Sequence, residues 1–264
     1  MLTEEVTLVT RREMVAAGTL TLVWSWLPPG LSAAGSRRHN PIYGCMLPPS
    51  ETAVFFGSAT ESRLYVTGEE PMIPHSGDRD FDYALAQTLA KISTWFDVAP
   101  GFAYFDDSDS PNAYATHVVR SNGADGTVLF GQQLLHRLLK GDDNPDLAVA
   151  CVCAHEFGHI LQYKRELDGK VRAGQPTVKR VELQADLFAG YFAGLRKRER
   201  PSFPAAVFAM TQYNMGDDKI HFPEHHGTRD ERAAAIVRGF ELGYRDRRSL
   251  AETIDASLAY VKSL

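Results

Sequence analysis

Two histidines and a glutamate stand at a spacing that suits metal chemistry in the segment His155-Glu156-Phe157-Gly158-His159. In an α-helix, residues four apart lie about 40° apart around the axis, so His155 and His159 share one face. Two imidazoles on one face can bind the same zinc ion, each at about 2.0–2.1 Å. Glu156 stands about 100° round from His155, where it can accept a proton from water that zinc has acidified. We therefore expect one zinc ion per chain and hydrolysis with Glu156 as the general base.

A catalytic zinc site takes a third protein ligand, and a later segment of the chain offers one. One known arrangement continues the helix as HExxHxxGxxH. This chain has Gln162 and Arg165 at the positions of that Gly and that last His, which excludes the arrangement. Glu182 and Asp186 are again four residues apart and therefore on one helix face. Glu182 is expected to bind the zinc, and Asp186 to accept a hydrogen bond from the far nitrogen of a ligating histidine.

The surroundings of both motifs are apolar. The segment 146–167 is apolar nearly all round in its first half, which predicts a helix buried at the centre of the domain. Leucine, alanine and phenylalanine also surround Glu182 and Asp186. Unpaired polar groups are costly in such places. A metal site is therefore favoured over the two alternatives, which are a pair of structural histidines and a solvated acidic helix face.

Hydrophobic periodicity and turn residues predict the elements that hold these side chains. Helices are expected over 80–97, 132–140, 146–167, 177–197, 228–242 and 249–262, with Asp146 as the cap of the third. Strands are expected over 51–56, 62–68, 101–107, 112–119 and 126–131, and a loop over 213–227. Strands that alternate with helices in the middle of the chain, followed by helices alone, indicate an α+β domain.

Composition excludes several classes of protein. Of the 264 residues, 44% are hydrophobic and 23% are charged, which is typical of a globular protein. With 28 basic and 33 acidic residues the formal charge is −5, which argues against a nucleic-acid binder. Three cysteines are too few for a disulfide framework. Cys151 and Cys153 are expected to be buried thiols, and a disulfide from Cys45 to either of them stays open.

The first 34 residues have the pattern of an export signal. Arg11 and Arg12 precede an apolar stretch over 14–27, and a run of small residues ends at Ala34. This order is typical of a secretory signal, and paired arginines are typical of twin-arginine export in bacteria. The alternative is a core helix or strand. We expect residues 1–34 to be a signal peptide and the mature protein to be periplasmic.

Export provides a testable prediction. Arg11→Lys/Arg12→Lys keeps the charge but removes the arginine pair, so the double variant is expected to stay in the cytoplasm. Cell fractionation measures this, and mass spectrometry of the periplasmic protein shows whether residues 1–34 have been removed. An unchanged periplasmic fraction would contradict twin-arginine export.

The two metal motifs together resemble those of glutamate-type zinc metallopeptidases (gluzincins), in which HExxH is followed by ExxxD. The segments AVACVCAHEFGHILQ and VELQADLFAGYFAG are similar to those of the HtpX and CaaX-prenyl-protease-like peptidases and of the bacterial neutral zinc metallopeptidases. In addition, 110–119 resembles the asparagine–alanine strand of these families, and 126–135 resembles their edge strand before the metal helix. The resemblance covers about residues 80–245. It implies a zincin-like fold for 80–264. The many prolines and glycines before residue 80 predict that 35–79 is an irregular extension packed on that domain.

A downstream segment resembles a further part of these families. His226 and Arg232 match their His-x5-Arg segment, with Gly227 where many members have proline. The resemblance implies that His226 stabilises the oxyanion of the reaction or orients a group that does so. The alternative is that His226 caps the helix that follows. Arg232 is expected to tie this loop to an acid near the zinc, and His221 and His225 to lie on the surface.

A zinc endopeptidase is the function that these residues indicate, with a peptide or protein substrate added as a strand along an exposed edge near 126–131. Two alternatives stay open: a non-catalytic zinc-binding adaptor or inhibitor, and a zinc amidase acting on a non-protein amide. Glu156 argues against the adaptor, because a pure binding site has no need of an acid there. No apolar run reaches the length of about 18 residues that a spanning helix needs, so the mature chain is expected to have no stable membrane span.

Overall fold

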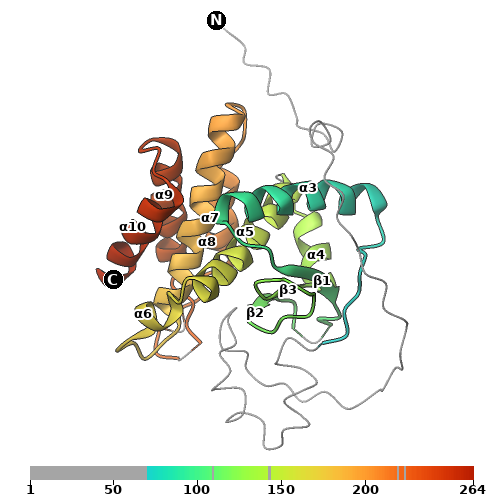
Figure 1. The fold of residues 1–264 in the computed structure, drawn as a ribbon, viewed down its shortest axis with the longest axis horizontal. Coiled ribbons are helices and arrows are strands. Elements are labelled where there is room, and N and C mark those ends of the chain that lie inside the picture. The colour runs from blue at the N-terminus through green and yellow to red at the C-terminus, as the bar shows by residue number, and fades with distance from the viewer. Residues whose placement is uncertain (1–69, 109, 142–143, 219, 223) are drawn as a thin grey trace, which may run out of the picture.

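The computed structural model describes residues 70–264 apart from 109, 142–143, 219 and 223. This part of the chain is α+β, as expected, with eight helices and one open three-stranded sheet (Figure 1). The helices are α3 (Arg79–Phe96), α4 (Gln132–Leu139), α5 (Pro145–Lys164), α6 (Asp168–Arg172), α7 (Lys179–Glu199), α8 (Ala206–Met215), α9 (Arg229–Tyr244) and α10 (Leu250–Lys262). The strands are β1 (Gly101–Phe105), β2 (Ala113–Thr116) and β3 (Thr127–Gly131).

Helix α5 runs through the middle of the domain (Figure 1). Every residue from 149 to 162 is buried, as the nearly all-round apolar pattern of this segment predicts. Helices α3, α4, α7 and α8 and strands β2 and β3 pack against it. The HExxH segment therefore lies on a helix that the core holds in place from several sides.

The sheet has the strand order β1-β3-β2, in which β3 is parallel to β1 and antiparallel to β2. The expectation that 126–131 forms an exposed edge is therefore wrong, because β3 has a hydrogen-bonded neighbour on each side. All five residues of β3 are buried, which is typical of a central strand covered on both faces. Among the described residues, the outer side of β1 carries a bridge between Ile73 and Tyr104. In the described part of the chain, the outer edge of β2 is accordingly the one without a strand partner, although all four residues of β2 are buried.

The helices differ from expectation in four respects. Helices α6 and α8 were not expected, and the predicted loop over 213–227 begins only after Met215. Helix α8 starts two residues after Pro204, a position where a proline removes no helical hydrogen bond. Phe208 of α8 is fully buried, so tertiary packing stabilises this short helix. Asp146 lies in the first turn of α5 and is not its N-cap residue.

Several expectations concern residues 1–69, which lie outside the described part of the chain. They are the signal peptide, the first two strands, most of the irregular extension and the pairing of Cys45. Cys151 and Cys153 are buried, as expected, and burial raises the pKa of both thiols. None of the described helices is long and apolar enough to cross a membrane.

Helices α7 and α9 approach each other closely through glycines. A Cβ atom at Gly190 of α7 would lie 2.0 Å from the carbonyl oxygen of Ile236. One at Gly239 of α9 would lie 1.8 Å from the carbonyl oxygen of Leu187. Because glycine has no Cβ atom, the backbones of α7 and α9 can pack this closely, whereas any other residue at these positions would place its Cβ atom too near the facing carbonyl oxygen. The close crossing holds α9 against α7 one turn after Asp186.

Gly239→Ala is expected to lower the free energy of unfolding by about 1–3 kcal/mol, the usual range for overpacking, because the methyl group would meet backbone. Gly169→Ala is the matched control, since a Cβ atom there meets nothing within 4 Å and alanine favours the helix. Urea denaturation measures both variants. Equal stability of Gly239→Ala and the parent chain would show that α7 and α9 separate easily.

Candidate metal centre

Three potential ligand atoms converge where α5 meets the first turn of α7. The Nε2 atoms of His155 and His159 lie 3.1 Å apart. The carboxylate of Glu182 lies 3.4 Å from the first of these atoms and 3.6 Å from the second. Two ligands at about 2.0–2.1 Å from one tetrahedral zinc ion would lie about 3.3 Å from each other. The three side chains are at most 2% exposed, and their spacing fits a single zinc ion.

Asp186 sets the orientation of the His155 ring. Its Oδ1 atom lies 2.8 Å from Nδ1 of the imidazole. An ionised carboxylate can only accept a hydrogen bond, so Nδ1 is the donor. In the neutral ring Nε2 then carries a lone pair, and this atom is the one that faces Glu182. A histidine held in this way is ready to bind a metal.

Gln162 orients the ring of His159 as Asp186 orients that of His155. The sequence did not predict this role of Gln162. Its Oε1 atom lies 2.7 Å from Nδ1 of the ring. Its amide nitrogen donates to the carbonyl of Val181 and to Oε1 of Gln184, both at 2.9 Å. The oxygen must therefore face His159, whose Nδ1 is the donor. The signal in the sequence is a glutamine three residues after the second histidine, inside an apolar helix.

The charges around these side chains favour a cation between them. Burial lowers the pKa of His155, but the charges of Asp186 and Glu182 outweigh burial and raise this pKa to about 10. Burial lowers the pKa of His159 to about 4, with a contribution from the charge on His155. Burial also opposes ionisation of Glu182, yet the neighbouring histidines hold its pKa well below the ordinary value. A proton on His155 thus supplies positive charge, and a divalent cation would replace it.

Arg232 of α9 contacts the acid that orients His155. Its Nε and Nη2 atoms donate to the two oxygens of Asp186 at 2.8 and 2.9 Å. Both side chains are buried. Burial would raise the pKa of Asp186, but Arg232 and His155 lower it overall. Asp186 therefore connects α5, α7 and α9 at the centre of the site.

Asp186→Asn is expected to weaken zinc binding about 10–100-fold, the usual effect of losing a group that orients a metal ligand. The free energy of unfolding should also fall, by about 3–5 kcal/mol, because Arg232 would stay buried without its counter-charge. Competition with a zinc chelator measures the affinity, and urea denaturation measures the stability. Asp255→Asn makes the same change at an exposed position of α10 and serves as the control. An unchanged zinc affinity would show that Asp186 does not support the metal ligand.

The loop between α8 and α9 brings two histidines to Asp217. Nδ1 of His225 lies 2.7 Å from one carboxylate oxygen. The backbone N–H of His226 donates to the other oxygen at 3.2 Å, and its Nδ1 lies 3.4 Å from that oxygen. His225 is only 3% exposed, so its expected surface position is wrong, because the carboxylate compensates for burial of the ring. His221 is exposed, as expected.

His226 is not the cap of α9. Thr228 stands at the N-cap position, where its hydroxyl accepts from the backbone N–H of Glu231 at 3.3 Å. The side chain of His226 is 27% exposed. It is near enough to Glu182 for its charge to contribute to the lowered pKa of that carboxyl. This electrostatic influence on Glu182 is what connects His226 with the candidate ligands, while its close contacts are with Asp217.

Glu156, the expected general base, is 1% exposed and lies on α5 directly after His155.

No protein-family model matches this chain, and no curated protein or solved structure matches it either. None of these comparisons identifies a family for the chain, so the resemblance to gluzincins rests on the sequence motifs alone.

Proposed function

We propose that this chain is a zinc-dependent endopeptidase of the gluzincin type, with a zincin-like catalytic domain and with His155, His159 and Glu182 as the zinc ligands. One observation carries the proposal. Hydrogen bonds at both Nδ1 atoms leave the two Nε2 atoms facing each other and the Glu182 carboxylate. Three electron-rich groups at this distance are unfavourable unless a proton or a cation lies between them. A pair of purely structural histidines would not need this arrangement.

Each residue near the ligands then has a part in peptide hydrolysis. Zinc, when bound, supplies a Lewis acid that polarises the carbonyl group and acidifies water. The carboxylate of Glu156 accepts a proton from the attacking water and passes it to the leaving amine. His226 donates a hydrogen bond to the carbonyl oxygen as that oxygen becomes negative. Asp217 holds His226 in place by accepting a hydrogen bond from the backbone N–H of His226.

The open edge of β2 is the place where we propose that the peptide binds. Main-chain groups of an edge strand can pair with an extended peptide, which gives affinity without requiring a particular sequence. Strand β2 packs against α5, the helix that carries both histidines and Glu156. The edge of β3, which the sequence favoured, is already paired on both sides. If residues 1–34 direct export, the substrates are periplasmic peptides or proteins.

The direct test is to incubate the zinc-loaded full chain with a mixed peptide library and to identify the products by mass spectrometry. We expect internal cleavages that a chelator abolishes and that added zinc restores. Bound zinc without cleavage of any peptide would contradict the peptidase. In that case a second assay on non-protein amides separates the amidase from the adaptor.

A further inference from the structure

Two basic runs far apart in the sequence meet at the other end of α7. Residues 196–200 contain four basic residues and one acid, and residues 245–248 contain three basic residues and one acid. The whole chain, in contrast, has a formal charge of −5. The close packing of α7 on α9 brings the C-terminal ends of both helices together. This concentration of positive charge therefore arises from the tertiary structure.

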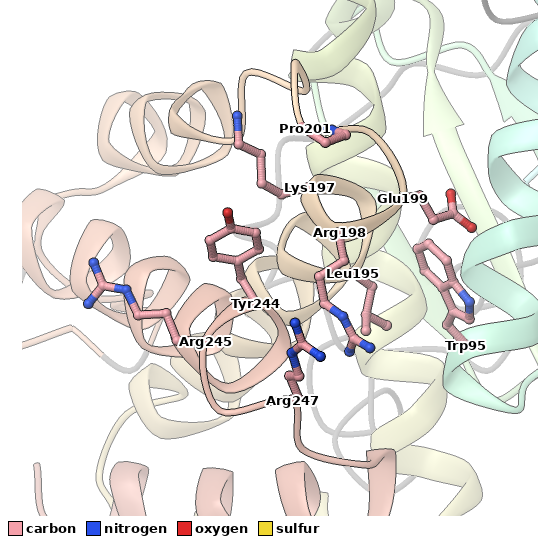
Figure 2. A pocket seen from close by; sticks show the side chains of 9 residues that line it. All are labelled: Trp95, Leu195, Lys197, Arg198, Glu199, Pro201, Tyr244, Arg245 and Arg247. Atoms are coloured by element: carbon pink, nitrogen blue, oxygen red, sulfur yellow. The ribbon is translucent and has the colours of Figure 1, made fainter.

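A pocket of about 810 Å³ lies between these runs, within the range of about 300–1,000 Å³ that is usual for small-molecule sites. Four cations line it, Lys197, Arg198, Arg245 and Arg247, against one acid. Figure 2 shows Arg198 and Arg247 turned toward the same part of the pocket, with Tyr244 beside them. Arg198 is 16 residues beyond Glu182 on the same helix, which corresponds to about 24 Å. The pocket is thus separate from the metal centre.

Of the four cations, Arg245 is the one that has a carboxylate partner among the described residues, Glu241 at 3.1 Å. Lys197 and Arg198 donate to the neutral backbone carbonyls of Phe203 and Gly243. Within the described residues, neither these two side chains nor Arg247 forms an ion pair with a carboxylate. The one lining acid, Glu199, is already paired with Lys91 and Arg196. In Figure 2 its carboxylate points away from Arg247.

Arg247 occupies a position that favours glycine. Its φ is +53°, and the backbone N–H of the next residue donates to the carbonyl of Leu242 at 2.9 Å. This is a left-handed helix end, where glycine has no steric cost and arginine does. The need to compensate the helix dipoles explains basic residues in the last turns, but it does not explain an arginine in this conformation beyond the helix. Asp97, Asn144 and Glu166 share this conformation, and Arg247 differs from them in that it lines the pocket.

We infer that this pocket binds a small anion with two or more phosphate groups. Planar guanidinium groups, such as those of Arg198 and Arg247, form paired hydrogen bonds with phosphate oxygens. Tyr244 is 39% exposed and offers a ring on which the base of a nucleotide can stack. The bounded volume and the net negative charge of the chain favour a small ligand over a nucleic acid. The inference does not depend on zinc or on peptidase activity.

Isothermal titration of the full chain with pyrophosphate and with ATP tests this inference. We expect binding of one anion per chain that weakens as salt is added. Arg198→Gln/Arg247→Gln should lower the affinity about tenfold or more, because charge-assisted hydrogen bonds are lost. The matched control is Arg137→Gln/Lys140→Gln, which makes the same change of charge at exposed positions of the α4 region. The control should leave the affinity within about twofold of the parent value.

Arg247→Gly supplies a second, independent readout. It should raise the melting temperature, because glycine relieves the left-handed backbone, and it should weaken pyrophosphate binding. A purely structural arginine would instead lower the melting temperature when removed. A further arm, co-sedimentation with phosphatidylcholine vesicles that contain phosphatidylinositol bisphosphate, shows whether a lipid headgroup is the source of the phosphates. Binding in neither arm, or equal loss in the control variant, would overturn the inference.

Discussion

Glu156→Gln should abolish nearly all peptide hydrolysis and leave the zinc content and the fold unchanged. Glutamine has almost the same shape as glutamate, so the buried position on α5 stays filled. Its amide cannot accept the proton of the attacking water, and general-base catalysis typically contributes about 10²–10⁴-fold to a rate. The rate of peptide cleavage by zinc-loaded protein measures this effect, and elemental analysis verifies the metal.

The matched control is Glu166→Gln, because Glu166 follows the same helix but is exposed. That variant should cleave peptides at the parent rate. Cleavage by Glu156→Gln at the parent rate, with zinc bound, would show that another group activates the water. The proposed mechanism would then be wrong even if the protein is a peptidase.

His155→Ala/His159→Ala should reduce the zinc content from about one ion per chain to almost none. Two of the three ligands are lost, and Glu182 alone cannot hold zinc at the concentrations left after dialysis. Zinc should raise the melting temperature of the parent chain, since a ligand that binds only the native state stabilises it. The double variant should show no such rise.

His117→Ala/His136→Ala removes the same number of imidazoles at exposed positions and is the control for adventitious binding. It should keep one zinc ion and the rise in melting temperature. Full zinc occupancy in His155→Ala/His159→Ala would locate the metal elsewhere. Together with Glu156→Gln, this variant separates an error in the metal site from an error in the chemistry.

Much of the metal centre can be predicted from local sequence. The helical period alone places His155 and His159 on one face, and the same period pairs Glu182 with Asp186. The apolar residues around them predict burial, because unpaired polar groups are costly in a core. Strand and helix positions between residues 80 and 140 also follow from short-range patterns. These features depend on neighbours within a few positions in the chain.

The parts that the sequence analysis missed depend on contacts between distant segments. The pattern of β3 does not reveal which strands lie beside it, since a fully apolar strand fits more than one order of the sheet. Gln162 gains its orienting role only because Val181 and Gln184 accept from its amide. His225 is buried only because Asp217 lies beside it.

What the sequence by itself determined is therefore the candidate ligand set His155, His159 and Glu182, which the fold brings together, the apolar helix that carries the two histidines and the α+β class. Only the tertiary structure decided which strand edge is open, which side chains orient the two imidazoles, and that 196–200 and 245–248 share one pocket. The physical reason is that helical and strand periods act over a few residues. The packing of α7 on α9, through backbones that meet at Gly190 and Gly239, joins segments about 50 residues apart in the chain.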